Sequence, residues 1–214
     1  MSANLQQQIV TRPILFSGPM VRALLDGSKT QTRRIAKDLN EWHAEENPID
    51  KCSVIDGVAH CDVQVFVDDV ITFEFPCRYG RIGDRLWVRE TWMPFDDDHR
   101  IGDCKYAYRA STSSDGEDIR KEYVRLGRKY QWRPSIHMPR AASRLTLEIT
   151  DIRVERLNAI TPEDAVKEGI AEWATEKKLN GYWTTAFSRL WESINGEGSW
   201  AQNPWVWVVE FKVV

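Results

Sequence analysis

The sequence of 214 residues predicts an α+β fold, in which helices and surface segments are inserted into a small mixed β-barrel. Segments such as 85–92 and 205–213 alternate apolar and polar residues, which is the period of a half-buried strand. Residues 161–169 and 183–194 carry helical patterns between the strands. A chain of this length, 42% hydrophobic and 29% charged, fits one globular domain spanning residues 1–214.

The N-terminal part predicts a strand, a helix and a second strand. Residues 13–17 form a short apolar run, and Gly18-Pro19 is a typical helix entry. An apolar pattern at helical spacing then continues to Gly27, which we expect to end the helix. Residues 30–35 alternate again and predict the second strand.

The C-terminal part predicts a bent strand, two helices and a closing strand. Residues 145–154 alternate, but the parity breaks at Thr150-Asp151, which predicts a β-bulge. Residues 161–169 begin with a hydroxyl N-cap and a proline, and they predict a short helix. Residues 183–194 predict an amphipathic helix, and residues 205–213 the last strand.

Two surface excursions are expected at about 38–80 and 93–142. The first is acidic and weakly patterned up to residues 63–75, which predict a strand or hairpin, so its tip should carry little structure. The second is rich in loops, with short strand candidates at residues 105–109 and 121–126.

Several classes of protein are disfavoured. The first residues carry no pattern of a secretory leader, and the longest apolar run, residues 205–209, is far below the roughly 20 residues of a membrane span. We therefore expect a cytoplasmic protein without membrane partners. The cysteines stand at wide, irregular spacings without a CxxC pair, so we expect free thiols, no metal site and no cofactor. They are Cys52, Cys61, Cys77 and Cys104.

Charge is distributed unevenly along the chain, although the net charge is only −3. Residues 120–144 hold eight basic residues and one acidic residue, whereas residues 38–74 hold ten acidic residues and one basic residue. One phosphate-facing side would produce this pattern, and so would two separate solvated faces. If the first interpretation holds, Arg125, Arg128 and Lys129 are candidate nucleic-acid contacts.

The segment around Gly27 contains several side chains that could bind or react with a ligand. A helix-ending glycine is followed within seven residues by Lys29, two threonines including Thr32, and the pair Arg33 and Arg34. These residues offer a cation, hydroxyl groups and guanidinium groups suited to phosphate. A charged, exposed turn remains the alternative.

The predicted strand at 85–92 contributes further candidates. Glu90 shares a face with apolar residues, so it is either a carboxylate in a cleft or the acid of a buried ion pair with an arginine. Trp87 and Arg89 lie on the opposite face and suit base stacking or phosphate contact, with ordinary packing as the alternative for Trp87.

These motifs resemble a known family. Gly27-Ser28-Lys29 followed by Arg33 or Arg34 resembles the GxKxxxxR signature of the ASCH domain, a relative of the PUA RNA-binding fold. The turn at Gly83-Asp84, the segment 160–169 and the last strand resemble further parts of the family in the same order. The resemblance implies a PUA-like barrel and an RNA-related function. With both excursions, the chain is similar to the longer ASCH proteins of phages and prophages.

One compact bacterial subfamily is similar in more detail. It is an amidohydrolase that removes the acetyl group from N4-acetylcytidine with a lysine, a threonine and a glutamate, and Lys29, Thr32 and Glu168 match these positions. The resemblance implies a hydrolase acting on a modified nucleoside or an RNA base. The alternatives are a non-catalytic RNA-binding module and an RNA-cleaving enzyme. The expected partner is a nucleoside or RNA, and nothing in the sequence indicates a protein partner.

Overall fold

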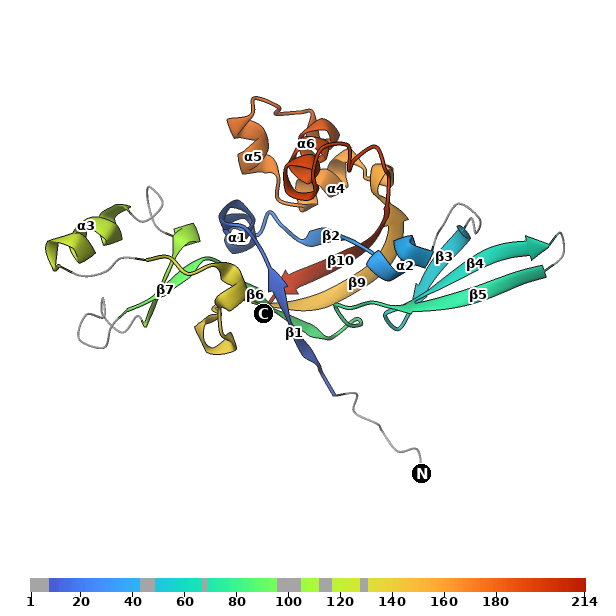
Figure 1. Ribbon diagram of the computed structural model, residues 1–214, viewed down its shortest axis with the longest axis horizontal. Coiled ribbons are helices and arrows are strands. Elements are labelled where there is room, and N and C mark those ends of the chain that lie inside the picture. The colour runs from blue at the N-terminus through green and yellow to red at the C-terminus, as the bar shows by residue number, and fades with distance from the viewer. Residues whose placement is uncertain (1–7, 43–48, 67–68, 96–104, 112–116, 128–130) are drawn as a thin grey trace.

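The computed structural model describes residues 8–42, 49–66, 69–95, 105–111, 117–127 and 131–214, and it is a mixed α+β structure (Figure 1). The first elements are β1 (Thr11–Leu15), α1 (Gly18–Leu25), β2 (Gln31–Ile35), α2 (Lys37–Trp42), β3 (Ile49–Ile55), β4 (Val58–Phe66) and β5 (Asp69–Pro76). Next come β6 (Arg85–Arg89), β7 (Trp92–Pro94), β8 (Tyr106–Tyr108), α3 (Glu117–Arg125) and the 3-10 turn η4 (Ser135–His137). The last are β9 (Thr146–Arg156), α4 (Pro162–Lys167), α5 (Ala171–Glu176), α6 (Trp183–Asn195) and β10 (Trp205–Val213).

The central sheet has five strands in the order β1-β6-β9-β10-β2. β1 runs parallel to β6, and the other neighbours are antiparallel. The predicted bulge is confirmed: Asp151 pairs with Glu210 and Ile149 pairs with Phe211, which leaves Thr150 as the extra residue. The bulge bends β9, the longest strand, where it runs along β10.

The predicted barrel does not close among the described strands. β1 and β2 are the two edges of the sheet, and no backbone pairing joins them there. A side chain spans the seam instead, because Arg34 Nη2 donates a hydrogen bond of 2.7 Å to Leu15 O. The sheet edges therefore approach each other without forming a ladder, and the candidate site lies at this seam.

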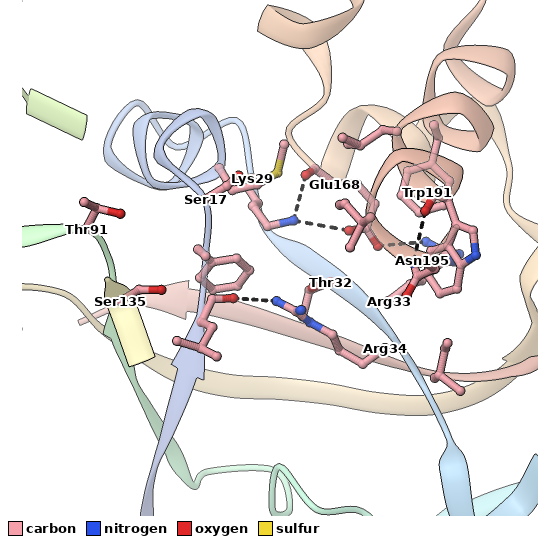
Figure 2. Close-up of a pocket in the computed structure, with 17 residues that line it drawn as sticks. Ser17, Lys29, Thr32, Arg33, Arg34, Thr91, Ser135, Glu168, Trp191 and Asn195 are labelled. Atoms are coloured by element: carbon pink, nitrogen blue, oxygen red, sulfur yellow. Dashed lines mark hydrogen bonds and ion pairs between the residues drawn. The ribbon is translucent and has the colours of Figure 1, made fainter. Parts of the chain in front are cut away.

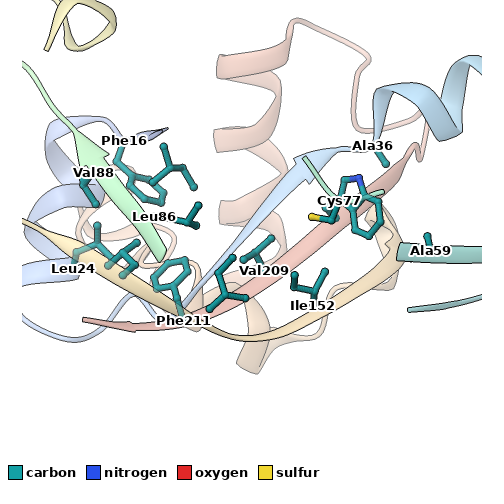
Figure 3. Packing of buried hydrophobic residues seen from close by; sticks show 14 of the residues in the cluster. Phe16, Leu24, Ala36, Ala59, Cys77, Leu86, Val88, Ile152, Val209 and Phe211 are labelled. Atoms are coloured by element: carbon teal, nitrogen blue, oxygen red, sulfur yellow. The ribbon is translucent and has the colours of Figure 1, made fainter. Parts of the chain in front are cut away.

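Apolar cores fill both faces of the sheet, as β10 illustrates. Val209 and Phe211 point into the cluster between the sheet and α1, which Figure 3 shows from close by. Val206 and Val208 point to the opposite face, where α4, α5 and α6 cover the sheet with side chains such as Trp191 (Figure 1). The apolar stripe predicted for α6 is confirmed at Phe187 and Trp191, which are buried, whereas Ile194 at its end is 68% exposed.

The first excursion confirms the hairpin predicted near residues 63–75, which is β4 paired with β5, but its tip differs from the expectation. Instead of an unstructured tip it forms the antiparallel sheet β3-β4-β5, which projects from the body (Figure 1). Cys52 and Cys61 stand directly opposite each other in this sheet and form a disulfide, so the prediction of free thiols is wrong for this pair. Strand register, which cysteine spacing does not reveal, decides this pairing. Cys77 is a buried free thiol, and Cys104 lies outside the described residues.

The second excursion contains β7 paired with β8 and the helix α3. The predicted strand at 121–126 is wrong, because this segment is helical. Its polar residues suit one face of a helix: Glu122 and Arg125 form an ion pair of 2.6 Å at helical spacing, and Tyr123 is buried. None of the described helices has the length and apolar character that a bilayer crossing requires.

Candidate functional site

A pocket of about 370 Å³ opens at the seam between β1 and β2 (Figure 2). Its polar side comes from β2 and the end of α4, with Lys29, Thr32 and Glu168. Residues of α6, including Trp191, form an apolar wall. Leu15, Thr91 and Ser135 are among the other lining residues, as are Arg33 and Arg34. Volumes of this order suit a small organic ligand.

Lys29 is fixed at the mouth of β2 by its backbone and its side chain. Its N–H donates to Ala23 O at 2.9 Å, and it forms an isolated antiparallel bridge with Glu168. Its Nζ donates to Gln31 O at 2.8 Å, to Glu168 O at 2.7 Å and to Glu168 Oε2 at 3.2 Å. The side chain is only 2% exposed, so all three ammonium hydrogens have partners within the protein.

Glu168 reaches the pocket because α4 ends there. Thr161 caps the start of α4 by accepting from the Asp164 N–H at 3.1 Å, as predicted, and Glu168 is the C-cap. Gly169 then adopts φ +76°, and a Cβ at this position would lie 2.8 Å from the Cβ atoms of Ala23 and Lys29. This close approach requires glycine, and it presses the end of α4 against the lysine.

Arg33 occupies a different place from the expected phosphate contact. Its side chain is 0% exposed and points to the helical face of the sheet. It donates to Glu155 at 3.0 Å and to Asp164 at 2.9 Å, and it lies 3.3 Å from Glu168 Oε1. Each oxygen of the Glu168 carboxylate therefore has its own cation, Lys29 on one side and Arg33 on the other. A buried guanidinium with this set of partners positions carboxylates and is closed to phosphate.

Thr32 lies on the opposite face of β2 from Arg33, as the alternation predicts. It is the register partner of Val209, and it is 3% exposed. No hydrogen bond of its hydroxyl is found among the described residues, although Thr32 lines the pocket. It is thus a buried hydroxyl available to a ligand.

Burial and the neighbouring carboxylate act on the pKa of Lys29 in opposite directions. Burial lowers the pKa of Lys29 below its ordinary value of 10.5, and the adjacent Glu168 carboxylate acts in the other direction. Arg34 and Arg33 add to the lowering. Lys29 Nζ and Arg34 Cζ also lie 5.3 and 5.4 Å from the centre of the Phe16 ring, which contributes cation–π attraction.

Two candidates of the central strand, Glu90 and Trp87, are occupied by contacts within the protein. Glu90 is 1% exposed and accepts from Arg144 Nε at 2.8 Å and Nη2 at 3.0 Å, so the ion-pair interpretation describes it. The Trp87 ring lies beneath the guanidinium groups of Arg89 and Arg140, at 5.3 and 5.9 Å. These contacts occupy the ring that base stacking would use.

The basic excursion contributes less than its sequence suggests. Arg125 is held by Glu122, and Arg128 and Lys129 lie outside the described residues. The sequence interpretation missed the pocket residues Thr91, Ser135 and Trp191. Thr91 follows Glu90 in the predicted strand 85–92. This neighbourhood is the one local signal that could have indicated Thr91 as a site residue. Nothing in the sequence places Ser135 or Trp191 near Lys29.

The described residues contain no group of three or more histidine, cysteine, aspartate or glutamate side chains arranged to hold a metal ion.

Comparisons with known proteins add little to this geometry. No protein-family model and no curated protein sequence matches the chain. Among solved structures, the ASCH domain from Lactobacillus crispatus JV V101 is similar, with 12% sequence identity and a TM-score of 0.36, over 100% of this chain and 86% of that chain. A TM-score this low carries no argument, so the site is interpreted from its own residues.

Proposed function

We propose that this protein is a hydrolase of the ASCH type that cleaves the exocyclic amide of an N4-acylated cytidine. The observation that carries the proposal is that Lys29 and Thr32 line one pocket together with Glu168, which lies 139 residues after Lys29 in the sequence. Lys29 and Glu168 are 3.2 Å apart, and the neighbouring Thr32 hydroxyl has no hydrogen bond within the described residues. The motif resemblance of the sequence supports the same assignment.

The proposed reaction divides three roles. Thr32 Oγ1 attacks the acyl carbon, and Glu168 accepts the hydroxyl proton. Lys29, whose Nζ lies 3.2 Å from that carboxylate, stabilises the oxyanion. The C–N bond then breaks, and Glu168 returns the proton to the departing exocyclic amine. Water hydrolyses the threonine ester, so that one acylcytidine and one water yield cytidine and a carboxylic acid.

The pocket fits such a substrate in polarity as well as in size. A pyrimidine base and its acyl group are largely apolar with a few acceptors. The wall supplied by Leu190, Trp191 and Ile194 is apolar, and the opposite side carries the polar groups. This division suits a ligand whose amide carbonyl faces Lys29 while its apolar part contacts α6.

The direct test is to incubate the purified protein with N4-acetylcytidine across roughly pH 5 to 9. Chromatography would separate cytidine from substrate, and acetate would be measured as the co-product. Equal release of cytidine and acetate supports the proposal. Absence of both products over the whole range, with a protein that is folded by circular dichroism, would end it.

One observation favours a second function, that of a non-catalytic RNA-binding module. All three Lys29 donors and both Glu168 oxygens already have partners inside the protein, as an idle polar cluster would. A catalytic set must exchange at least one of these contacts for substrate. Binding of RNA without product release from any acylcytidine would support this alternative, and a labelled RNA in the same incubation would also reveal strand cleavage on a gel.

A further inference from the structure

Four arginines that have no carboxylate partner among the described residues lie in the pocket or on segments next to it: Arg34 lines the pocket, and the other three belong to β6 and to the segment 133–140, whose Ser135 also lines it. They are Arg34, Arg89, Arg133 and Arg140, called the arginine rim below. Arginines elsewhere in the described chain include many that are neutralised, such as Arg33, Arg125 and Arg144. Like charges gathered around one opening repel one another, and a bound anion relieves that repulsion.

Each guanidinium of the rim rests on an aromatic ring. Arg34 lies over Phe16, and Arg133 lies 5.2 Å from the centre of the Trp92 ring. Arg89 and Arg140 share the ring of Trp87. An arginine held this way keeps its N–H edges available for hydrogen bonds while its face is covered. The side chains are therefore ordered before a ligand arrives, which lowers the entropic cost of binding.

Hydrogen bonds connect the rim into one surface that begins at the pocket. Arg34 is bonded to Leu15 O, and Leu15 is the register partner of Arg89. Arg89 in turn donates to Met138 O at 3.2 Å and to Ile136 O, and thereby holds η4, whose Ser135 lines the pocket. Arg140 lies over the same Trp87 ring as Arg89, and its Nη2 donates to Thr146 Oγ1 at 3.2 Å.

Arg133 lies on the other side of η4. Its backbone is paired with Trp92, the residue after Thr91, and both Thr91 and Ser135 line the pocket. Arg133 and Arg140 are exposed, so solvent and ligands reach them. The rim thus extends beyond the pocket in two directions.

We infer that the pocket serves a base within a single strand of nucleic acid, and that the arginine rim binds the phosphates on either side of that base. A pocket of about 370 Å³ holds one nucleoside, whereas the rim continues over η4 and β6, further than one nucleotide requires. A base that enters a side pocket must be unpaired or flipped out, which single strands allow at low cost. This inference rests on the proposed function for the base in the pocket, but its phosphate part stands on the rim alone.

The experiment measures binding by fluorescence anisotropy with labelled strands of about 12 nucleotides, within the site size of single-strand binders. RNA and DNA of the same cytosine-containing sequence, and the RNA in duplex form, are titrated at several salt concentrations. Arg133→Gln and Arg140→Gln are compared with Arg125→Gln, which removes an equally exposed charge that Glu122 already neutralises. Circular dichroism and Tm values establish that each variant is folded.

We expect each rim variant to bind single strands about threefold to tenfold more weakly and the control variant to match the wild type. Because each lost phosphate contact releases fewer counterions, the slope of log K against log salt should become shallower by about 0.7 per variant. Tight binding of RNA alone points to contacts with the 2′-hydroxyl, and equal binding of DNA points to phosphates only; both support the inference. Equal losses in all three variants, a preference for duplex, or no binding would overturn it.

The same variants separate this inference from the proposed hydrolysis. Arg140→Gln should lower kcat/KM for an acetylated base within a strand more than it lowers kcat/KM for the free nucleoside. If no acylcytidine is hydrolysed in either form, the proposed function fails, while the anisotropy comparison still decides whether the rim binds a strand.

Discussion

Lys29 and Glu168 are joined twice: Lys29 Nζ donates both to the backbone oxygen of Glu168 at 2.7 Å and to its carboxylate at 3.2 Å. The backbone bond fixes the lysine to the end of α4 whatever the charge of the glutamate. The carboxylate bond adds an electrostatic contact that substrate or protonation can exchange. Position and charge are therefore controlled separately at the site, and variants can test them separately.

Thr32→Val tests the nucleophile. The change removes the hydroxyl at nearly constant shape, so turnover of N4-acetylcytidine should fall at least about 10²-fold while Tm changes little. Thr30→Val is the matched control, because Thr30 is exposed two residues earlier. If steady-state kinetics show the same small loss of turnover in both variants, Thr32 is not the nucleophile.

Glu168→Gln tests the proton acceptor through the pH profile of kcat. If Glu168 is the base, the variant loses the rising limb of the wild-type pH profile together with at least about 10² in rate. If Lys29 is the base, the limb persists. It then moves to lower pH, because the carboxylate that opposes the lowering of the Lys29 pKa has been removed. We expect the first outcome.

Arg33→Met tests the buried carboxylate cluster. Removal of the guanidinium leaves Glu155, Asp164 and Glu168 without their shared cation, so the free energy of unfolding should fall by about 3 kcal/mol or more. Arg125→Met removes an exposed pair that solvent screens, so the free energy of unfolding should change far less. Urea denaturation of both variants gives the comparison, and equal values would contradict a structural role for Arg33.

Gly169→Ala tests the close approach of α4 to Lys29. Gly169 and Gly181 both have positive φ, +76° and +85°, but only Gly169 has neighbours within 4 Å of an added Cβ. The alanine at 169 should therefore cost about 1–3 kcal/mol more than the alanine at 181, and it should also lower turnover by displacing Lys29. Equal Tm shifts for the two variants would show that the approach is not tight.

Asp84→Asn tests acid stability. Burial alone would raise the pKa of Asp84, but the N–H of Val10, the Arg12 guanidinium and the N–H of Arg81 outweigh it and hold the pKa below 3.8. A lowered carboxyl pKa gives stability that is present above about pH 4 and is lost as the pH falls through the folded-state pKa. The stability difference between wild type and Asp84→Asn should thus shrink on acidification, as urea titrations at pH 7 and pH 3 would measure.

The sequence predicts those parts of the molecule that local rules govern. The cap at Thr161, the bulge at Thr150 and the alternation that separates Thr32 from Arg33 follow from propensity and strand period, and all three are present. Lys29 and Glu168 were brought together by motif resemblance, because no local rule links residues so far apart.

The incorrect predictions share a physical cause, since each concerns a feature that depends on contacts between distant segments. The Cys52–Cys61 bond depends on hairpin register, and the burial of Arg33 depends on three carboxylates from β9 and α4. Closure of the predicted barrel depends on whether β1 and β2 pair, and the seam carries a side chain in place of a ladder. Charge counts along the sequence likewise cannot distinguish a neutralised arginine such as Arg125 from an available one such as Arg140.

The sheet order also constrains when the site can form during synthesis. β2, which carries Thr32, has its strand partner in β10, and the carbonyl that holds Lys29 comes from a residue 139 positions later. A ribosome must therefore release nearly the whole chain before the lysine loses its water, and until then both pocket edges remain solvated. Assembly of the pocket is thus a late event in folding, governed by closure of a long loop, and a chain truncated before β10 would have no site.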